Sequence, residues 1–133
     1  MAGTLVIDTV KSSTSGPPSF QNTSGTEVGQ LCRAWVNFNG TSPVNIRASF
    51  NVSSVTRNAT GDYTVNFSTS MVDASYSVSG YCVLTGSDSG DAAFVGLRTT
   101  AGTGLTTSNI SLRTQSTYAV TVDCLVVSIS IFR

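Results

Sequence analysis

Residues 34–67 read AWVNFNGTSPVNIRASFNVSSVTRNATGDYTVNF, and this stretch decides the fold class. Apolar side chains fall on every second position, which is the period of a β-strand with one buried face. The alternation breaks at Asn39-Gly40 and again at Gly61-Asp62, where residues that tolerate tight turns stand together. The stretch therefore predicts antiparallel strands that follow one another through short turns.

The alternation is clearest over residues 44–52, where apolar and polar side chains take opposite faces. The predicted core-facing set is Val44, Ile46, Ala48, Phe50 and Val52. Further strands are expected over residues 31–38, 63–67, 74–84, 92–99, 110–114 and 116–132. The last of these becomes apolar on both faces at residues 124–127, so we expect it to be covered on both sides.

The chain before this body has a different composition. A short strand is predicted over residues 3–10, and a segment rich in Ser, Thr, Gly and Pro follows it. Pro17-Pro18 fix an extended backbone without amide donors, which is typical of an arm. We therefore predict an N-terminal strand and arm over residues 1–27 and one all-β domain over residues 28–133. That domain is an antiparallel, jelly-roll-like β-sandwich whose strand order the linear pattern does not fix.

The composition excludes several classes of partner. The chain has 133 residues, equal numbers of basic and acidic side chains and only 11% charged residues. A net charge of zero gives no attraction toward nucleic acid or anionic lipid, so we expect no nucleic-acid partner. No apolar run reaches the length of a membrane span, and the N-terminus lacks the regions of a signal peptide. We therefore expect no membrane insertion.

The sequence offers little reactive chemistry. It contains no histidine, which excludes Ser-His-Asp and Cys-His sites as well as histidine metal ligands. Asp88 and Asp91 share the turn GSDSGD, but Asp and Gly are also the residues that turns require for their own geometry. Three scattered cysteines, Cys32, Cys82 and Cys124, are expected to be reduced and to pack as small apolar groups. We predict no enzyme activity, no metal and no cofactor.

Two aromatic side chains fall outside the core alternation. Trp35 and Tyr81 are out of phase with their apolar neighbours, so they face away from the predicted core. Such a ring either stacks on a sugar or is buried against another surface, and we favour the arm or a second subunit. The candidate subunit-interface residues are Val6, Phe20, Trp35, Tyr81, Val127 and Ile129.

Residues 32–78, CRAWVNFNGTSPVNIRASFNVSSVTRNATGDYTVNFSTSMVDASYSV, resemble a segment of tail-fibre and related virion proteins of tailed bacteriophages. The opening TLVIDTVKSSTSGPPSFQNTSGTEVG is similar to the N-terminal lead-in of short fibre-like proteins of this group. Together the two segments cover nearly the first 80 residues, whereas residues 80–133 resemble no family. The resemblance implies a trimeric, β-structured virion part without enzymatic activity or cofactor, assembled in the bacterial cytoplasm.

Two functions follow from this resemblance. The first is a short trimeric tail fibre or receptor-binding component, because a chain of 133 residues leaves no room for an elongated shaft. Its arm would dock on a tail or baseplate protein, and its loops at residues 85–91 and 101–109 would meet a host surface glycan or protein. The alternative is a capsid decoration or cement protein, whose arm would cross a major capsid subunit. A depolymerase that uses Asp88 and Asp91 is the enzymatic alternative.

Overall fold

The computed structural model describes residues 3, 6–13, 17–84, 92–98 and 104–133. No helix occurs among these residues, and none of them forms a segment that could cross a membrane as a helix. The chain divides into two units, Met1–Leu31 and Cys32–Arg133. The second unit therefore begins four residues after the start of the expected domain.

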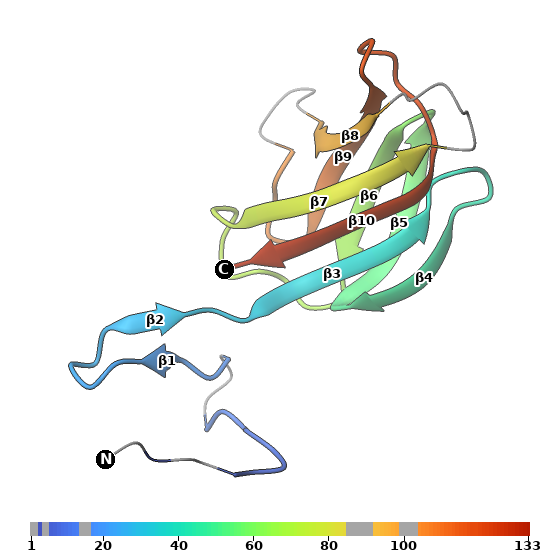
Figure 1. Ribbon diagram of the computed structural model, residues 1–133. Helices are drawn as coiled ribbons and strands as arrows, with labels where there is room; N and C mark the ends of the chain where they lie inside the picture. Colours follow the sequence, from blue (N-terminus) through green and yellow to red (C-terminus); the bar gives the residue numbers. More distant parts are fainter. Residues whose placement is uncertain (1–2, 4–5, 14–16, 85–91, 99–103) are drawn as a thin grey trace. The chain divides into compact units, whose positions relative to one another are not determined.

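The second unit is a sandwich of two four-stranded antiparallel sheets, as the alternation predicts (Figure 1). In the first sheet the order is β4 (Asn45–Phe50), β3 (Cys32–Asn39), β10 (Cys124–Phe132) and β7 (Ser77–Leu84). In the second the order is β5 (Val52–Ala59), β6 (Asp62–Phe67), β9 (Asn109–Ser116) and β8 (Ala93–Leu97). Strands β4 and β5 are the edges on one side of the sandwich, and β7 and β8 are the edges on the other.

The chain passes from the first sheet to the second at Asn51, between β4 and β5. Asn51 has a φ of 55°, a left-handed conformation that asparagine tolerates better than most residues. Its side-chain amide donates to the carbonyls of Arg33 and Thr69, and its Oδ1 accepts from the Thr69 amide at 2.7 Å. One polar residue thus satisfies the backbone groups that the change of sheet leaves unpaired.

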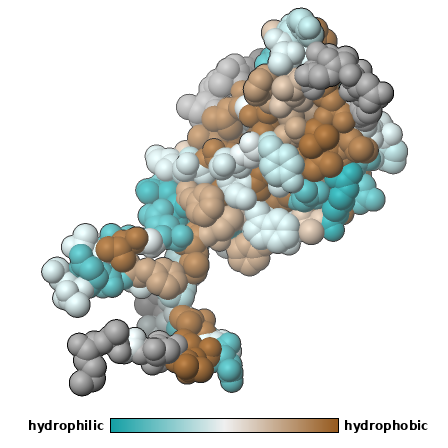
Figure 2. Space-filling view, in the orientation of Figure 1, coloured by the Kyte–Doolittle hydropathy of each residue, from teal (hydrophilic) through white to brown (hydrophobic). Residues whose placement is uncertain are grey.

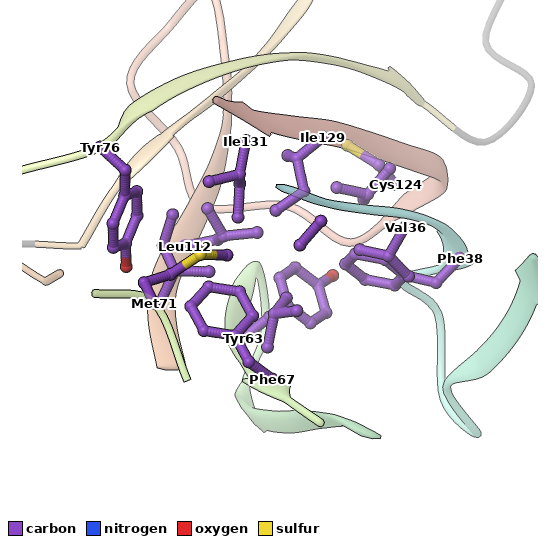
Figure 3. Packing of buried hydrophobic residues seen from close by; sticks show 14 residues of the cluster. Val36, Phe38, Tyr63, Phe67, Met71, Tyr76, Leu112, Cys124, Ile129 and Ile131 are labelled. Atoms are coloured by element: carbon purple, nitrogen blue, oxygen red, sulfur yellow. The ribbon is translucent and has the colours of Figure 1, made fainter. Parts of the chain in front are cut away.

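The core lies between the two sheets and is built from the inward positions of β3, β6, β9 and β10 (Figure 3). Two edge-to-face aromatic pairs contribute to it, Phe38 with Tyr63 at 5.2 Å and Phe67 with Tyr76 at 6.0 Å between ring centroids. The first pair joins the two sheets, since Phe38 belongs to β3 and Tyr63 to β6. Such contacts add to the stabilisation from apolar burial.

The first unit differs from the expected arm. The described residues within 3–10 form no strand, so that prediction is wrong for the part that the structure shows. A short hairpin forms instead, from β1 (Phe20–Gln21) and β2 (Glu27–Gly29). Its turn is closed by Asn22, whose Oδ1 accepts from the amides of Ser24 and Thr26. A short polar side chain thus orders a segment whose composition indicates only a linker.

Candidate functional site: an aromatic face on one sheet

The outer face of the β4-β3-β10-β7 sheet presents large apolar side chains to solvent. Figure 2 shows the molecule in the orientation of Figure 1, in which this sheet is in front and its surface mixes hydrophobic and hydrophilic residues. The exposed large side chains that the pairing of the strands places on this face are Trp35, Phe50, Tyr81, Val83 and Phe132, and the exposed Leu125 lies in the bulge of β10 next to Val126, which pairs with Val83. We call this set the aromatic face.

Its centre is a cross-strand pair of rings on β3 and β4. Trp35 lies directly opposite Phe50, and their side chains are 37% and 55% exposed. The register of the two strands shifts between Asn37 and Phe38, which turns Ala48 and Phe50 outward while Ile46 stays inward. The prediction that Ala48 and Phe50 face the core is therefore wrong, because one irregular step in the pairing exchanges the two faces of a strand.

Serine residues on β10 and β7 separate the rings. Ser130 pairs with Trp35 on one side and Ser79 on the other, and Ser128 lies beside Tyr81. From the strand spacing and the rise per residue, Trp35 and Tyr81 are roughly 12 Å apart. Among the described residues, the hydroxyls of these three serines have no hydrogen-bond partner. They are therefore available to a ligand or a second chain.

Arg47 of β4 places a guanidinium at the border of the face. Arg47 donates from Nη2 to the carbonyl of Leu125 at 2.7 Å and from Nη1 to Oδ1 of Asn37 at 3.3 Å. No group of three or more metal-ligating side chains occurs in the described part of the chain. Rings, hydroxyls and a guanidinium make a surface suited to contact with a partner.

Comparison with known proteins gives a likeness in fold but no match in sequence. No family model matches the chain, and no curated protein matches its sequence. The chain is similar in fold to part of a phage tailspike. That solved structure is the phiAB6 tailspike in complex with three-repeated oligosaccharides of Acinetobacter baumannii surface polysaccharide, with a TM-score of 0.52 and 14% identity. The likeness covers 97% of this chain but only 30% of the tailspike, and at this identity it shows the fold alone.

The predicted interface residues fall into two groups, of which the first is exposed. Trp35 and Tyr81 belong to the aromatic face, with Tyr81 57% exposed. Val6 and Phe20 lie in the first unit, and both are exposed. These four side chains are therefore accessible within one chain, and their place at a subunit interface stays a prediction.

Val127 and Ile129 require a correction. Both are buried in the core of a single sandwich, with 0% and 1% of their surface exposed, so they offer no surface to another subunit. The pairing between β10 and β7 shifts between Cys124 and Val126, and this bulge fixes which apolar residues face inward. Leu125 is turned outward instead, and the sequence pattern alone did not distinguish it from its neighbours.

Two acidic residues beside strand ends, Asp62 and Asp73, form ion pairs in the described part of the chain. Asp88 and Asp91, together with residues 85–91 and 101–103 of the predicted host-contacting loops, lie outside the described residues. Asp62 forms an ion pair with Arg98 at 2.8 Å. Asp73 forms one with Arg133, and this carboxyl also accepts from the amide of Ser75. Asp62 and Asp73 therefore both have structural partners.

A polar cluster around Asp123 was missed by the sequence analysis. Asp123 accepts from Nε and Nη2 of Arg57, from the amide of Gly61 at 2.8 Å and from the hydroxyl of Tyr63 at 2.8 Å. Burial, and then the hydrogen bond to Asp123, raise the pKa of the fully buried Tyr63, so its hydroxyl stays protonated. The cluster joins the β9–β10 connection to β5 and β6, and we assign it to stability.

The three cysteines are free thiols, as expected. Cys124 is buried, while Cys32 and Cys82 are half-buried. The hydrogen bond between Cys82 and Cys124, and then burial, raise the pKa of the Cys82 thiol. The Cys82 thiol is therefore a poor nucleophile and a poor metal ligand, whereas the same hydrogen bond lowers the pKa of the buried Cys124 thiol.

Proposed function

We propose that this chain is a non-enzymatic structural component of a bacteriophage tail, a short trimeric fibre or receptor-binding part that attaches the virion to its host. The observation that carries this proposal is the likeness in fold between 97% of the chain and part of a phage tailspike. The resemblance of residues 32–78 to virion proteins of tailed phages supports it independently of the coordinates.

The aromatic face supplies the contact surface that such a part requires. Exposed Trp35, Phe50 and Tyr81 on one face of a sheet form the kind of patch that marks an interaction site. We assign this face to the contact between copies of the chain, in which the rings of one copy exclude water from the next. In a trimer, each copy would then bury side chains that a single sandwich leaves exposed.

A specific observation favours a second use of the same face. The hydroxyls of Ser128 and Ser130 lie between Trp35 and Tyr81, with that of Ser79 beside them, and none of the three has a hydrogen-bond partner in the described part of the chain. A sugar binds well where a ring stacks on its apolar side and nearby hydroxyls bond to its own hydroxyls. The similar tailspike was solved with oligosaccharides of a bacterial surface polysaccharide. A host surface glycan is therefore the ligand we assign if the face is open in the assembled protein.

We therefore propose that the protein is a component of the virion, that its partners are other tail or baseplate proteins, and that it uses no cofactor. A tail location is preferred to capsid decoration because the fold likeness is to a tail protein. Counting copies per particle tests this choice, since a few to a few tens indicate a tail part and hundreds indicate the capsid. Incubating the protein with host polysaccharide, with Asp88 and Asp91 intact or replaced, tests the absence of cleavage.

Replacing Trp35 and Tyr81 by serine tests the role of the face. The matched control is Tyr118→Ser, because this ring is 76% exposed but lies outside the aromatic face. The readouts are mass in solution and binding to host cells, after circular dichroism has confirmed folding. Loss of the trimer supports the subunit contact, and loss of cell binding by an intact trimer supports the glycan contact. Variants that match the control in both readouts contradict the proposal for this face.

A further inference from the structure

The side of the sandwich between β7 and β8 contains an apolar groove. Its cavity has a volume of about 160 Å³ and is lined by both edge strands, with Leu112 and Ile129 among its lining residues. Leu97 faces inward from β8 and yet is 40% exposed, so the groove opens to solvent beside this strand. A dry cavity of about 150 Å³ with a similar lining accepts a benzene molecule, so the groove has room for one apolar side chain.

The lining excludes a charged or strongly polar occupant. It contains no carboxylate, amine or guanidinium, and its one hydroxyl, that of Tyr76, already donates to the carbonyls of Thr106 at 3.0 Å and Asn109 at 3.2 Å. An ionised or unpaired polar group placed here would lose its hydration without gaining a partner. The occupant must therefore present an apolar group.

The two strands beside the groove lack the features that normally protect an edge. Strands β7 and β8 contain no charged residue and no proline, whereas β4 and β5 contain Arg47 and Arg57. Within the described residues, β7 pairs only with β10, and β8 pairs only with β9. An apolar edge with unpaired amides and carbonyls is suited to receive a further strand.

The outer side of β8 offers a charge for that strand. Arg113 on β9 pairs with Gly96, and its Nε is buried without a hydrogen-bond partner in the part of the chain that the structure describes. A Cβ built on Gly96 meets nothing within 4 Å, so the space between Arg113 and the free edge is open. A carboxylate on an added strand, opposite Gly96, would reach this guanidinium.

Residues 6–10 of the N-terminal segment can complement both the apolar groove and the guanidinium of Arg113. Residues Val6–Val10 read VIDTV, are rich in β-branched side chains, and lie outside any strand with Val6, Ile7 and Val10 exposed. In an extended conformation Ile7 points to one face and Asp8 to the other. The segment therefore presents one apolar side chain toward the groove and one carboxylate toward Arg113.

We propose that residues Val6–Val10 of a second copy of the chain add to the free edge of β8 as an antiparallel strand. In this register Ile7 lies opposite Leu97 and fills the groove, and Asp8 lies opposite Gly96 and pairs with Arg113. Val10 then meets the exposed ring of Phe94, a favourable cross-strand pair. The inference deepens the proposed function, because it rests on the trimer and names a contact that links its subunits.

The first test changes only the arm, so the sandwich remains folded. Ile7→Ser removes the side chain that enters the groove, while Val6→Ser, its neighbour on the other face, is the matched control. Analytical ultracentrifugation over a concentration series should show trimer dissociation at about tenfold higher concentration for Ile7→Ser. The control should change by less than about threefold. Equal behaviour of the two variants overturns the inference while leaving the trimer in place.

The second test reverses the two charges of the proposed ion pair between Asp8 and Arg113. Asp8→Arg and Arg113→Asp should each weaken the trimer, and the double variant Asp8→Arg/Arg113→Asp should recover most of the lost stability of the trimer.

A third test uses crosslinking. A photo-reactive aliphatic amino acid at position 7 should crosslink to β8 residues of another copy. Crosslinks that form only within one chain overturn the exchange between copies. A wild-type protein that is monomeric overturns both this contact and the proposed trimer, whereas a trimer that fails to bind host cells counts against the proposed function alone.

Discussion

At Asp123, one carboxylate accepts hydrogen bonds from three parts of the chain, and its protonation state therefore affects stability. Burial raises the pKa of this carboxyl, but the hydrogen bonds from Arg57, Gly61 and Tyr63 outweigh burial and hold the pKa below its ordinary value. A lowered folded-state pKa stabilises the protein above the unfolded-state pKa, and that stability is lost as the pH falls through the folded value.

We expect Asp123→Asn to lower the melting temperature at pH 7 and to flatten its decline below about pH 4. Asn cannot accept from Arg57 as an ionised group does, and it has no proton to take up in acid. Asp73→Asn is the control, since Asp73 and Arg133 are exposed at the surface and an exposed pair contributes little. Thermal melts from pH 7 to pH 2.5 are the measurement. A variant with the wild-type melting temperature at pH 7 and the wild-type pH profile contradicts the role of the cluster.

At the scale of the strand, glycine decides how closely β7 and β8 approach. A Cβ built on Gly80 lies 2.5 Å from the carbonyl oxygen of Ser128, 2.8 Å from Cγ2 of Ile129 and 3.2 Å from Cγ1 of Val95. The first of these atoms belongs to the backbone of β10, which cannot move without disturbing the central pairing of the sheet. Gly80 therefore lets the two edge strands pack together beside the groove.

Gly80→Ala should destabilise the sandwich by about 1–3 kcal/mol, because the methyl group forces β7 away from β10. Gly96→Ala is the matched control on the neighbouring edge, where a built Cβ meets nothing, and it should change stability by less than about 0.5 kcal/mol. Urea unfolding followed by tryptophan fluorescence measures both variants. Equal stability of Gly80→Ala and the wild type would show that β7 is less constrained than its contacts indicate.

Some strands were predicted correctly from the sequence, and others were not. Period-two alternation correctly indicated β3 and β6, since regular strands keep one face inward throughout. It misassigned Phe50 and Val127, because bulges in β4 and β10 shift the register and no local pattern marks them. It also missed β5, whose Ser, Thr and Asn residues resemble a turn and whose pairing with β6 is decided by tertiary contacts.

For the whole molecule, the sequence predicted the sandwich but not the order of its strands. Alternation indicates which side chains are buried, whereas strand order depends on contacts between distant segments. The aromatic face was predicted in part, since Trp35 and Tyr81 are out of phase with the core. Its remaining rings, Phe50 and Phe132, were not predicted. The orientation of Phe50 depends on the bulge in β4, and that of Phe132 depends on the pairing of β10 with β3 and β7.

The assembled molecule should have three times the 13.8 kDa mass of one chain at micromolar concentration. Because rings and aliphatic groups make up most of the proposed interface, and Asp8–Arg113 is the one ion pair proposed in it, its mass should stay the same between about 0.05 and 0.5 M salt. Light scattering coupled to size-exclusion chromatography measures this. A species with the mass of one chain across the series would exclude the trimer.

The position of β10 also has a consequence for how the protein is made. Of the ten strands that the described residues form, it is the last to leave the ribosome, yet it lies in the middle of its sheet, between β3 and β7. Until it emerges, those two strands have no common neighbour, so the sheet can close only after nearly all of residues 32–132 have been synthesised. A nascent chain truncated before Cys124 would therefore leave β7 without a partner and one edge of β3 unpaired, and it would become a target for chaperones or proteases.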